Sequence, residues 1–313
     1  MFNNNKNKYQ IRTDIAFEEL DFRRLEKSSD EIVEEHSVDG LMVRKTYVGQ
    51  RVADEINKKS GMYYMIDSSS VEGIDSNEKI ESALIYVLKD LLAFENIKPT
   101  DKGLIVGLGN INITPDSLGP LVCDNILVTR HLFDTEDKNL NGLSNISAIS
   151  PGVMGQTGLE TTDIIEAIVT KSNIDYIIVI DSLASRSVKR VNKTIQVTNA
   201  GISPGSGVGS KRKEISKNTL KIPVIAIGVP TVVDSITIVS DTMDKVAKHF
   251  IKDDHPFKHM DSLNDRERRI LFEEILGEHN FMVTPKDIDC EIEDLSRIIS
   301  NALDRALHSV LTS

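Results

Sequence analysis

Three short, almost wholly apolar runs constrain the fold of this chain more than any other feature. They are GLIVGLG at residues 103–109, DYIIVID at 175–181 and PVIAIGV at 223–229. Apolar runs of this length without polar alternation are typical of strands buried on both faces, as in parallel sheets. Segments with helical periodicity, 118–128 and 159–170, lie between them. The sequence therefore predicts an α/β doubly wound domain, with a mostly parallel central sheet covered by helices on both faces.

The flanking segments extend this prediction. Residues 41–48 and 63–67 have the composition of strands, and residues 78–95 place an aliphatic stripe along one face of a helix. Toward the C-terminus, residues 264–277 and 292–310 also have helical patterns. We therefore expect one large domain with a helical C-terminal part.

Charge and composition narrow the function classes. The 313 residues carry a formal net charge of −11, which gives no global attraction for nucleic acid. The two cysteines, Cys123 and Cys290, are too few for a disulfide framework or a four-ligand zinc site. No run approaches the roughly 20 apolar residues of a membrane span, and the polar N-terminus lacks the apolar core of a secretory signal. We expect a cytoplasmic protein that binds no membrane and does not bind nucleic acid directly.

Two aspartates follow buried strands. Asp116 lies in GLGNINITPDSLGP, where Thr114 and Pro115 resemble a helix start, and Asp181 ends the run IIVID. The carboxyl ends of parallel strands share one edge of the sheet, where open α/β folds bind ligands. Asp116 and Asp181 therefore converge if their strands are neighbours. Taken singly, each could instead be a helix-terminal acid without a chemical role.

Two close carboxylates form an acid–base device. Because like charges a few ångströms apart disfavour double ionisation, one group takes a proton from water while the other polarises a carbonyl or protonates a leaving amine. The helix start favours Asp116 as base and Asp181 as acid, although such a pair titrates as a unit and the assignment stays open. The same carboxylates could hold Mg²⁺ or Mn²⁺, which leaves metal-assisted hydrolysis as an alternative.

Other chemistries fit the sequence less well. The glycines at 107 and 109 lack the third glycine of a dinucleotide fingerprint, because Asn112 stands in its place. Ser182 and Ser185 lie near Asp181, but no histidine has an evident triad position, and His131 is expected at the surface. Neither a nicotinamide cofactor nor a serine nucleophile is therefore predicted.

Two loops are candidate binding elements. PGVMGQTGLETTD, residues 151–163, is a glycine-rich turn into a helix. Its free N–H groups could hold a carbonyl oxyanion or a peptide backbone, or it is a purely structural turn. Its candidate substrate-binding residues are Gly155, Gln156, Thr157 and Gly158. The basic run at 211–213 is expected to be a solvated loop, or a contact for an acidic substrate or partner subunit.

Four motifs in this order, GLGNINITPDSLGP, PGVMGQTGLET, IDSLASR and SPGSGVGSKRKEIS, resemble the germination proteases of spore-forming bacteria. The resemblance implies a homotetrameric aspartic endopeptidase, akin in fold to hydrogenase-maturation peptidases, that degrades small acid-soluble spore proteins during germination. It places the protein in the forespore or spore core. We expect no cofactor and no metal, with a metal-dependent peptidase, as among the fold relatives, as the alternative. The resemblance assigns the catalytic pair to Asp116 and Asp181. The alternative from another class is a non-catalytic module that binds spore proteins.

The resemblance also implies a zymogen. Residues 1–14 would be a propeptide and residues 15–313 the peptidase domain. TDIAFE at residues 13–18 is similar to the family's processing site, which predicts self-cleavage between Asp14 and Ile15. The Asn- and Lys-rich residues 1–14 are expected to be poorly ordered, and the cleavage segment is expected to be accessible.

Overall fold

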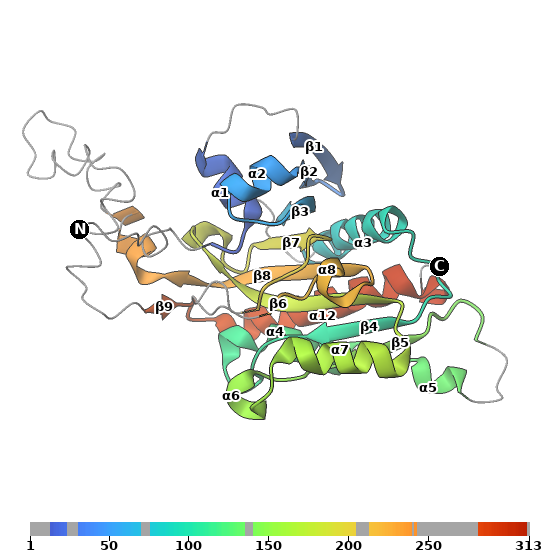
Figure 1. The fold of residues 1–313 in the computed structure, drawn as a ribbon. Coiled ribbons are helices and arrows are strands. Elements are labelled where there is room, and N and C mark those ends of the chain that lie inside the picture. Colours follow the sequence, from blue (N-terminus) through green and yellow to red (C-terminus); the bar gives the residue numbers. More distant parts are fainter. Residues whose placement is uncertain are drawn as a thin grey trace, which may run out of the picture.

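A computed structural model describes most of the chain as one sheet with helices on both faces (Figure 1). The described residues are 13–23, 31–69, 76–134, 140–204, 213–239, 241–242 and 281–311. The predicted helix at 264–277 lies outside these residues. None of the helices in the described part combines the length and hydropathy needed to cross a bilayer.

The described strands form a nine-stranded sheet. In spatial order they are β1 (Glu31–Val38), β2 (Leu41–Val48), β3 (Gly61–Asp67), β7 (Thr194–Thr198), β8 (Val224–Asp234), β6 (Tyr176–Ser185), β4 (Gly103–Gly107) and β5 (Ile146–Ile149), with β9 (Met282–Val283) paired to β8. The prediction of a central sheet between helices is confirmed, but the sheet is mixed. Only β8, β6, β4 and β5 pair in parallel, and the other pairings are antiparallel. The sequence did not reveal this because three of the antiparallel strands, β1, β7 and β9, are short or polar.

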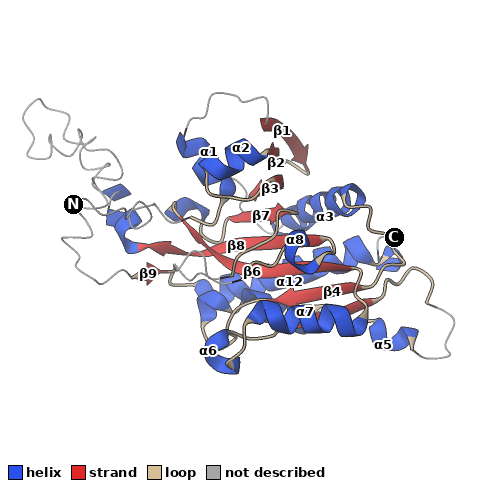
Figure 2. Cartoon of the chain, viewed as in Figure 1, coloured by secondary structure: helices blue, strands red, loops and turns tan. Residues whose placement is uncertain are grey.

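The helices divide between the two faces of the sheet (Figure 2). They include α1 (Ala16–Arg23), α2 (Gln50–Glu55), α3 (Ser76–Phe94), α4 (Leu118–Asn125), α5 (Arg130–Phe133), α6 (Met154–Thr157), α7 (Thr161–Ser172), α8 (Lys217–Leu220) and α12 (Ile288–Leu307), with single 3₁₀ turns at Thr114–Asp116, Val188–Arg190 and Ser309–Leu311. Residues 235–239, directly after β8, are also helical. The long amphipathic helices α3 and α12 confirm the predictions for 78–95 and 292–310.

Successive side chains of β6 point to opposite faces of the sheet, so this strand contributes to the cores on both faces. Ile178 and Ile180 belong to the core formed with α3, α4 and α12, whereas Ile177 and Val179 pack with residues of α7 and α8. A third apolar cluster joins α1 and α2 to the sheet through Ile15, Phe17 and neighbouring side chains. The strand that carries Asp181 is thus the centre of the packing.

Two predicted strands are longer than their apolar runs. β6 continues past Asp181 to Ser185, and β8 continues to Asp234, because the two strands stay paired over this length. Asp181 pairs with Gly228 of β8. The prediction that Asp181 ends its strand is therefore wrong. It lies within β6, with four further strand residues beyond it.

The C-terminal end of α12 holds a carboxyl group whose protonation should affect stability. Asp304 accepts the Leu127 N–H through Oδ1 at 3.1 Å and Oδ2 at 3.3 Å. Burial raises the pKa of Asp304 to about 6, while the hydrogen bond from Leu127 acts in the opposite direction. The pKa of an aspartate in the unfolded chain is about 3.9. The contribution of Asp304 to the free energy of unfolding is therefore fully present below about pH 3.9 and is lost as the pH rises through about 6, because the buried carboxyl must then ionise.

We expect Asp304→Asn to raise the free energy of unfolding at pH 7 by about 1 kcal/mol, a figure reduced for the partial exposure of the group. The gain should vanish near pH 4, where the wild-type carboxyl is also neutral. Urea unfolding at several pH values measures this, and Asp294→Asn on the exposed face of the same helix is the control. An equal pH dependence in both variants would contradict the prediction.

Candidate active site

A tight loop after β4 sets the position of Asp116. The loop begins against the neighbouring strand, since Leu108 N–H donates to the Ile180 carbonyl at 2.8 Å. Gly109 has a φ of +116°, and a Cβ there would lie 2.0 Å from the Asp116 carbonyl oxygen, so this approach requires glycine. Asn110 N–H donates both to that oxygen, at 3.0 Å, and to Asp116 Oδ2, at 2.9 Å. The backbone therefore holds the Asp116 side chain in place.

The local structure at Asp116 differs from the predicted helix start. Residues Thr114–Asp116 form a single 3₁₀ turn, because Asp116 N–H bonds Ile113 and Ser117 N–H bonds Thr114, each three residues back. Helix α4 begins only at Leu118. Thr114 is therefore not the cap of α4, and Asp116 precedes the helix instead of lying in its first turn.

Asp116 and Asp181 line the same cavity, as the strand argument predicted. β4 and β6 are adjacent and parallel, with Gly107 opposite Ile180. Asp181 is 8% exposed, and its Oδ1 accepts the Ser182 N–H at 3.0 Å. The cavity has a volume of about 1110 Å³ and opens between the end of α2, the 109–116 loop and the strands β6, β7 and β8.

A segment of the chain's own N-terminal region forms part of the cavity wall. Thr13 and Asp14 are among the lining residues. Asp14 N–H donates to the Ala184 carbonyl at 2.9 Å, and Ala184 N–H donates to Asp14 Oδ2 at 2.9 Å. Ala184 is on β6, so the predicted cleavage segment lies against the strand that carries Asp181.

Two side chains add contacts along this segment. Lys58 Nζ donates to the Thr13 carbonyl at 2.7 Å. Burial lowers the pKa of Lys58, and the carboxylates around it, Asp14 foremost, act in the opposite direction. Gln196 of β7 accepts the Ala16 N–H at 2.7 Å and donates to the Asp14 carbonyl at 3.3 Å. The predicted scissile bond is therefore spanned by one side chain.

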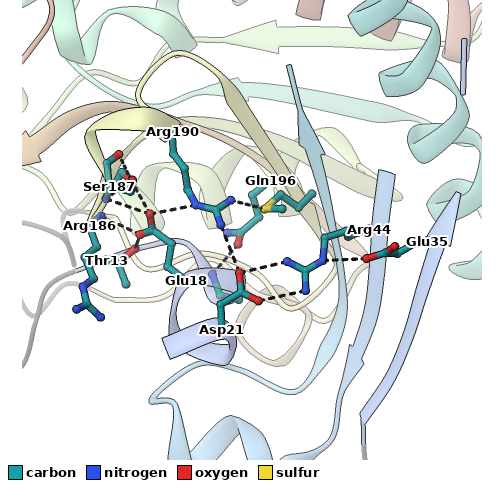
Figure 3. Close-up of polar contacts among 12 residues, drawn as sticks. Thr13, Glu18, Asp21, Glu35, Arg44, Arg186, Ser187, Arg190 and Gln196 are labelled. Carbon is teal, nitrogen blue, oxygen red and sulfur yellow. Dashed lines mark hydrogen bonds and ion pairs between the residues drawn. The ribbon is translucent and has the colours of Figure 1, made fainter. Parts of the chain in front are cut away.

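Glu18 anchors the start of α1 (Figure 3). It is 6% exposed and accepts hydrogen bonds from the backbone or side chains of four partners: Thr13 Oγ1 at 2.5 Å, Ser185 Oγ at 2.8 Å, Arg186 N at 2.8 Å and Ser187 N at 3.1 Å. Arg190 Nε completes the site at 3.4 Å. A buried carboxylate needs such a set of donors. Glu18 thereby ties α1 to the loop that follows β6.

The expectation of an accessible cleavage segment is wrong for the residues described. Ile15, Ala16 and Phe17 are all 0% exposed. Their apolar side chains pack beneath α1 against α2 and the sheet, which outweighs the polarity of the residues before Asp14. The Asp14–Ile15 bond is thus held at the cavity and not in a free loop.

Other predicted site residues lie outside the cavity lining. Helix α6 contains Gly155, Gln156 and Thr157, and Gly158 ends it with a φ of +72°. All four are exposed. Gln156 nevertheless bonds Asn110 Oδ1 at 2.7 Å, which supports the loop beside Asp116. A substrate-binding role for this turn stays a prediction.

His131, Cys123 and Lys213 lie outside the cavity lining. His131 lies in the short helix α5, and Cys123 is partly buried against the main core. Lys213 pairs with Asp163 at 2.9 Å and with Glu166 at 3.3 Å on the exposed side of α7. Residues 211 and 212 lie outside the described part of the chain.

Sequence reasoning missed two residues that contact the cleavage segment. Gln196 lies in β7, a five-residue strand that the sequence did not reveal, and Lys58 lies in a polar turn that looks like a solvated loop. Among the described residues, no group of three or more His, Cys, Asp or Glu side chains is arranged to hold a metal ion.

These features define a class of protein, an α/β fold with two carboxylates at one cavity. Asp116 comes from the turn after β4, Asp181 comes from the neighbouring strand β6, and Thr13 and Asp14 form part of the cavity wall. Sequence comparison then identifies the family. The germination protease family matches residues 12–261 and 254–313. The germination protease of Bacillus licheniformis is 41% identical over 345 residues, which cover 96% of this chain and 94% of the relative, and that of Bacillus pumilus is 39% identical over 97% and 95%. This chain belongs to the germination protease family, and it is a peptidase of spore germination.

Among solved structures, the chain is similar to the [NiFe] hydrogenase maturation protease HycI of Thermococcus kodakarensis. The TM-score is 0.35 at 12% identity, over 71% of this chain and 98% of that protein.

The Glu18 site predicts an asymmetry between two neighbouring acids of α1. Glu18→Ala would remove the acceptor of the Arg186 N–H, one of the two acceptors of the Ser187 N–H and the carboxylate that Arg190 Nε faces. Because Glu18 itself is buried, we expect this change to lower the free energy of unfolding by about 3 kcal/mol. Asp21→Ala removes an exposed partner of Arg44 and Arg190 and should cost less than about 1 kcal/mol. Chemical denaturation of both variants measures the difference, and equal losses would contradict the role of Glu18 as the anchor.

Proposed function

We propose that this protein is an aspartic-type endopeptidase made as a self-processing zymogen. Asp116 and Asp181 activate water between them, and the first bond cut is Asp14–Ile15, which separates propeptide residues 1–14 from peptidase residues 15–313. The mature enzyme then hydrolyses small acid-soluble spore proteins during germination. The observation that carries this proposal is that the two aspartates and the cleavage segment line a single cavity.

The chemistry follows from the carboxylate pair. One aspartate is ionised and takes a proton from water as the water oxygen adds to the Asp14 carbonyl carbon. The other is protonated and gives its proton to the Ile15 nitrogen as the carbon–nitrogen bond breaks. The products are a new carboxyl group at residue 14 and a new amine at residue 15. Either aspartate could be the base, with the other as the acid.

The position of the segment also suggests how processing alters the site. Thr13 and Asp14 form part of the cavity wall and occupy both the N–H and the carbonyl of Ala184. Loss of residues 1–14 would free these groups, together with Lys58, beside Asp181. An extended peptide could then bind β6 through the same main-chain groups. Processing would thereby convert a self-occupied cavity into one that accepts a substrate.

The environment of the enzyme completes the proposal. Its net charge of −11 favours encounter with basic substrate proteins and disfavours nucleic acid. We place it in the forespore or spore core as a homotetramer, without membrane contact, on the strength of its family.

The test is self-processing of the full chain, followed by intact mass. Wild type should lose residues 1–14, in the presence of EDTA as in its absence. Asp116→Asn and Asp181→Asn keep the side-chain shapes but remove acid–base chemistry, so each should slow processing by about 10²- to 10⁴-fold. Asp124→Asn, an exposed change on α4, is the matched control and should process normally.

Each other outcome has a meaning. If EDTA stops the wild type, the two aspartates act as metal ligands and the enzyme is a metal-dependent peptidase. If spore proteins bind but neither they nor the chain are cut, the protein is a binding module. If both aspartate variants still process, the active site lies elsewhere.

A further inference from the structure

Gln196 is the side chain that spans the Asp14–Ile15 bond. It lies in the middle of β7, is 7% exposed and lines the cavity that contains Asp116 and Asp181. Its Oε1 accepts the Ala16 N–H at 2.7 Å, and its Nε2 donates to the Asp14 carbonyl oxygen at 3.3 Å. The Asp14 carbonyl is the one that water must attack if the chain is cut at this bond.

The orientation of this amide is fixed by chemistry. A backbone N–H can only donate, so the Ala16 N–H requires the oxygen of the Gln196 amide. The NH₂ group must then face the Asp14 carbonyl. β7 holds Gln196 between its neighbours, with Met65 of β3 on one side and Gly228 of β8 on the other. The donor is therefore preorganised on a strand and does not depend on a flexible loop.

A donor in this position has a specific use. When water adds to a peptide carbonyl, negative charge develops on the oxygen, and a fixed donor in a buried site stabilises that charge more than it stabilises the starting carbonyl. The 3.3 Å separation is long for the starting state, and it leaves room for the bond to shorten as charge develops.

The other contacts of the segment act on different atoms. Ala184 binds the Asp14 N–H and carboxylate, and Lys58 binds the Thr13 carbonyl. These contacts hold the peptide along β6. The Gln196 contact reaches the carbonyl of the bond itself.

We propose that Gln196 is a catalytic residue of self-cleavage, which donates its side-chain amide N–H to the Asp14 carbonyl and stabilises the oxyanion. This inference rests on the proposed cleavage between Asp14 and Ile15. Water supplies the oxygen that bonds to the carbonyl carbon and gives one proton to the ionised aspartate. The negative charge on the former carbonyl oxygen is held by Gln196, and it returns to re-form the carbonyl as the Ile15 nitrogen leaves with the proton of the other aspartate.

Gln196 also ties α1 to the sheet through Ala16, and the experiment must separate this structural effect from catalysis. Gln196→Met keeps the side-chain length and removes both contacts. Arg190→Met removes a different contact of α1, with Glu18 and Asp21, and touches neither Asp14 nor Ile15. Gln196→Glu keeps an acceptor for Ala16 but, when ionised, cannot donate to the carbonyl.

Self-processing of the full chain is followed by intact mass, and folding by thermal melting. We expect Gln196→Met and Gln196→Glu to process at least about 100-fold more slowly than wild type while remaining folded. Arg190→Met should process at a rate closer to that of wild type than to that of either Gln196 variant, even if it melts at a lower temperature. If Gln196→Met does not fold, the comparison rests on Gln196→Glu.

Folded Gln196 variants that process at the wild-type rate would overturn the inference and leave the proposed function standing. Equal slowing by Arg190→Met and Gln196→Met would also overturn it, because Gln196 would then only anchor α1. If wild type does not cut at Asp14–Ile15 at all, the proposed function fails first, and the inference fails with it.

Discussion

The parallel pairing of β4 with β6 is the interaction on which the rest of the site depends. It places Gly107 opposite Ile180, so that the loop after β4 passes beside Asp181. Two glycines make this approach possible. A Cβ on Gly107 would lie 2.1 Å from the Gly119 carbonyl oxygen at the start of α4, and a Cβ on Gly109 would meet Asp116. A register shift of one residue would reverse the faces of β6 and move Asp181 away from the cavity.

Residues 13–23 pack against the sheet and form part of this arrangement. Ile15 and Phe17 belong to the apolar cluster that joins α1 and α2 to the sheet. Glu18 accepts a hydrogen bond from the loop after β6, and Asp14 is hydrogen-bonded to β6 itself. Burial of the residues after Asp14 fixes where the polypeptide crosses the cavity wall. The same contacts that stabilise α1 therefore determine which residues of the chain form this part of the cavity wall. Under the proposed function, they would also determine which peptide bond is cut.

Much of this could be predicted from the sequence, for identifiable reasons. The buried strands β4, β6 and β8 and the helices α3, α7 and α12 have strong apolar patterns. The adjacency of β4 and β6 places Asp116 and Asp181 at one cavity, although Asp181 lies within its strand and not at the strand end. In the antiparallel half of the sheet, β2 and β3 were predicted as strands, but β1 and β7 were missed because β1 is mostly polar and β7 has only five residues. Gln196 and Lys58 were missed because their roles come from contacts with residues 13–16, more than 40 positions away, which no local pattern reports. The extent of β6 beyond Asp181 likewise depends on its pairing with β8.

The central claim is that water, held by the two aspartates, reaches the carbonyl carbon of residue 14. A crystal structure of the full-length Asp181→Asn variant, with its N-terminal residues still attached, tests this most directly. The account predicts a water molecule hydrogen-bonded to the side chains of residues 116 and 181 and about 3 to 3.5 Å from the Asp14 carbonyl carbon. It would be contradicted if the two side chains lie too far apart for one water to contact both, or if the 14–15 bond faces away from them.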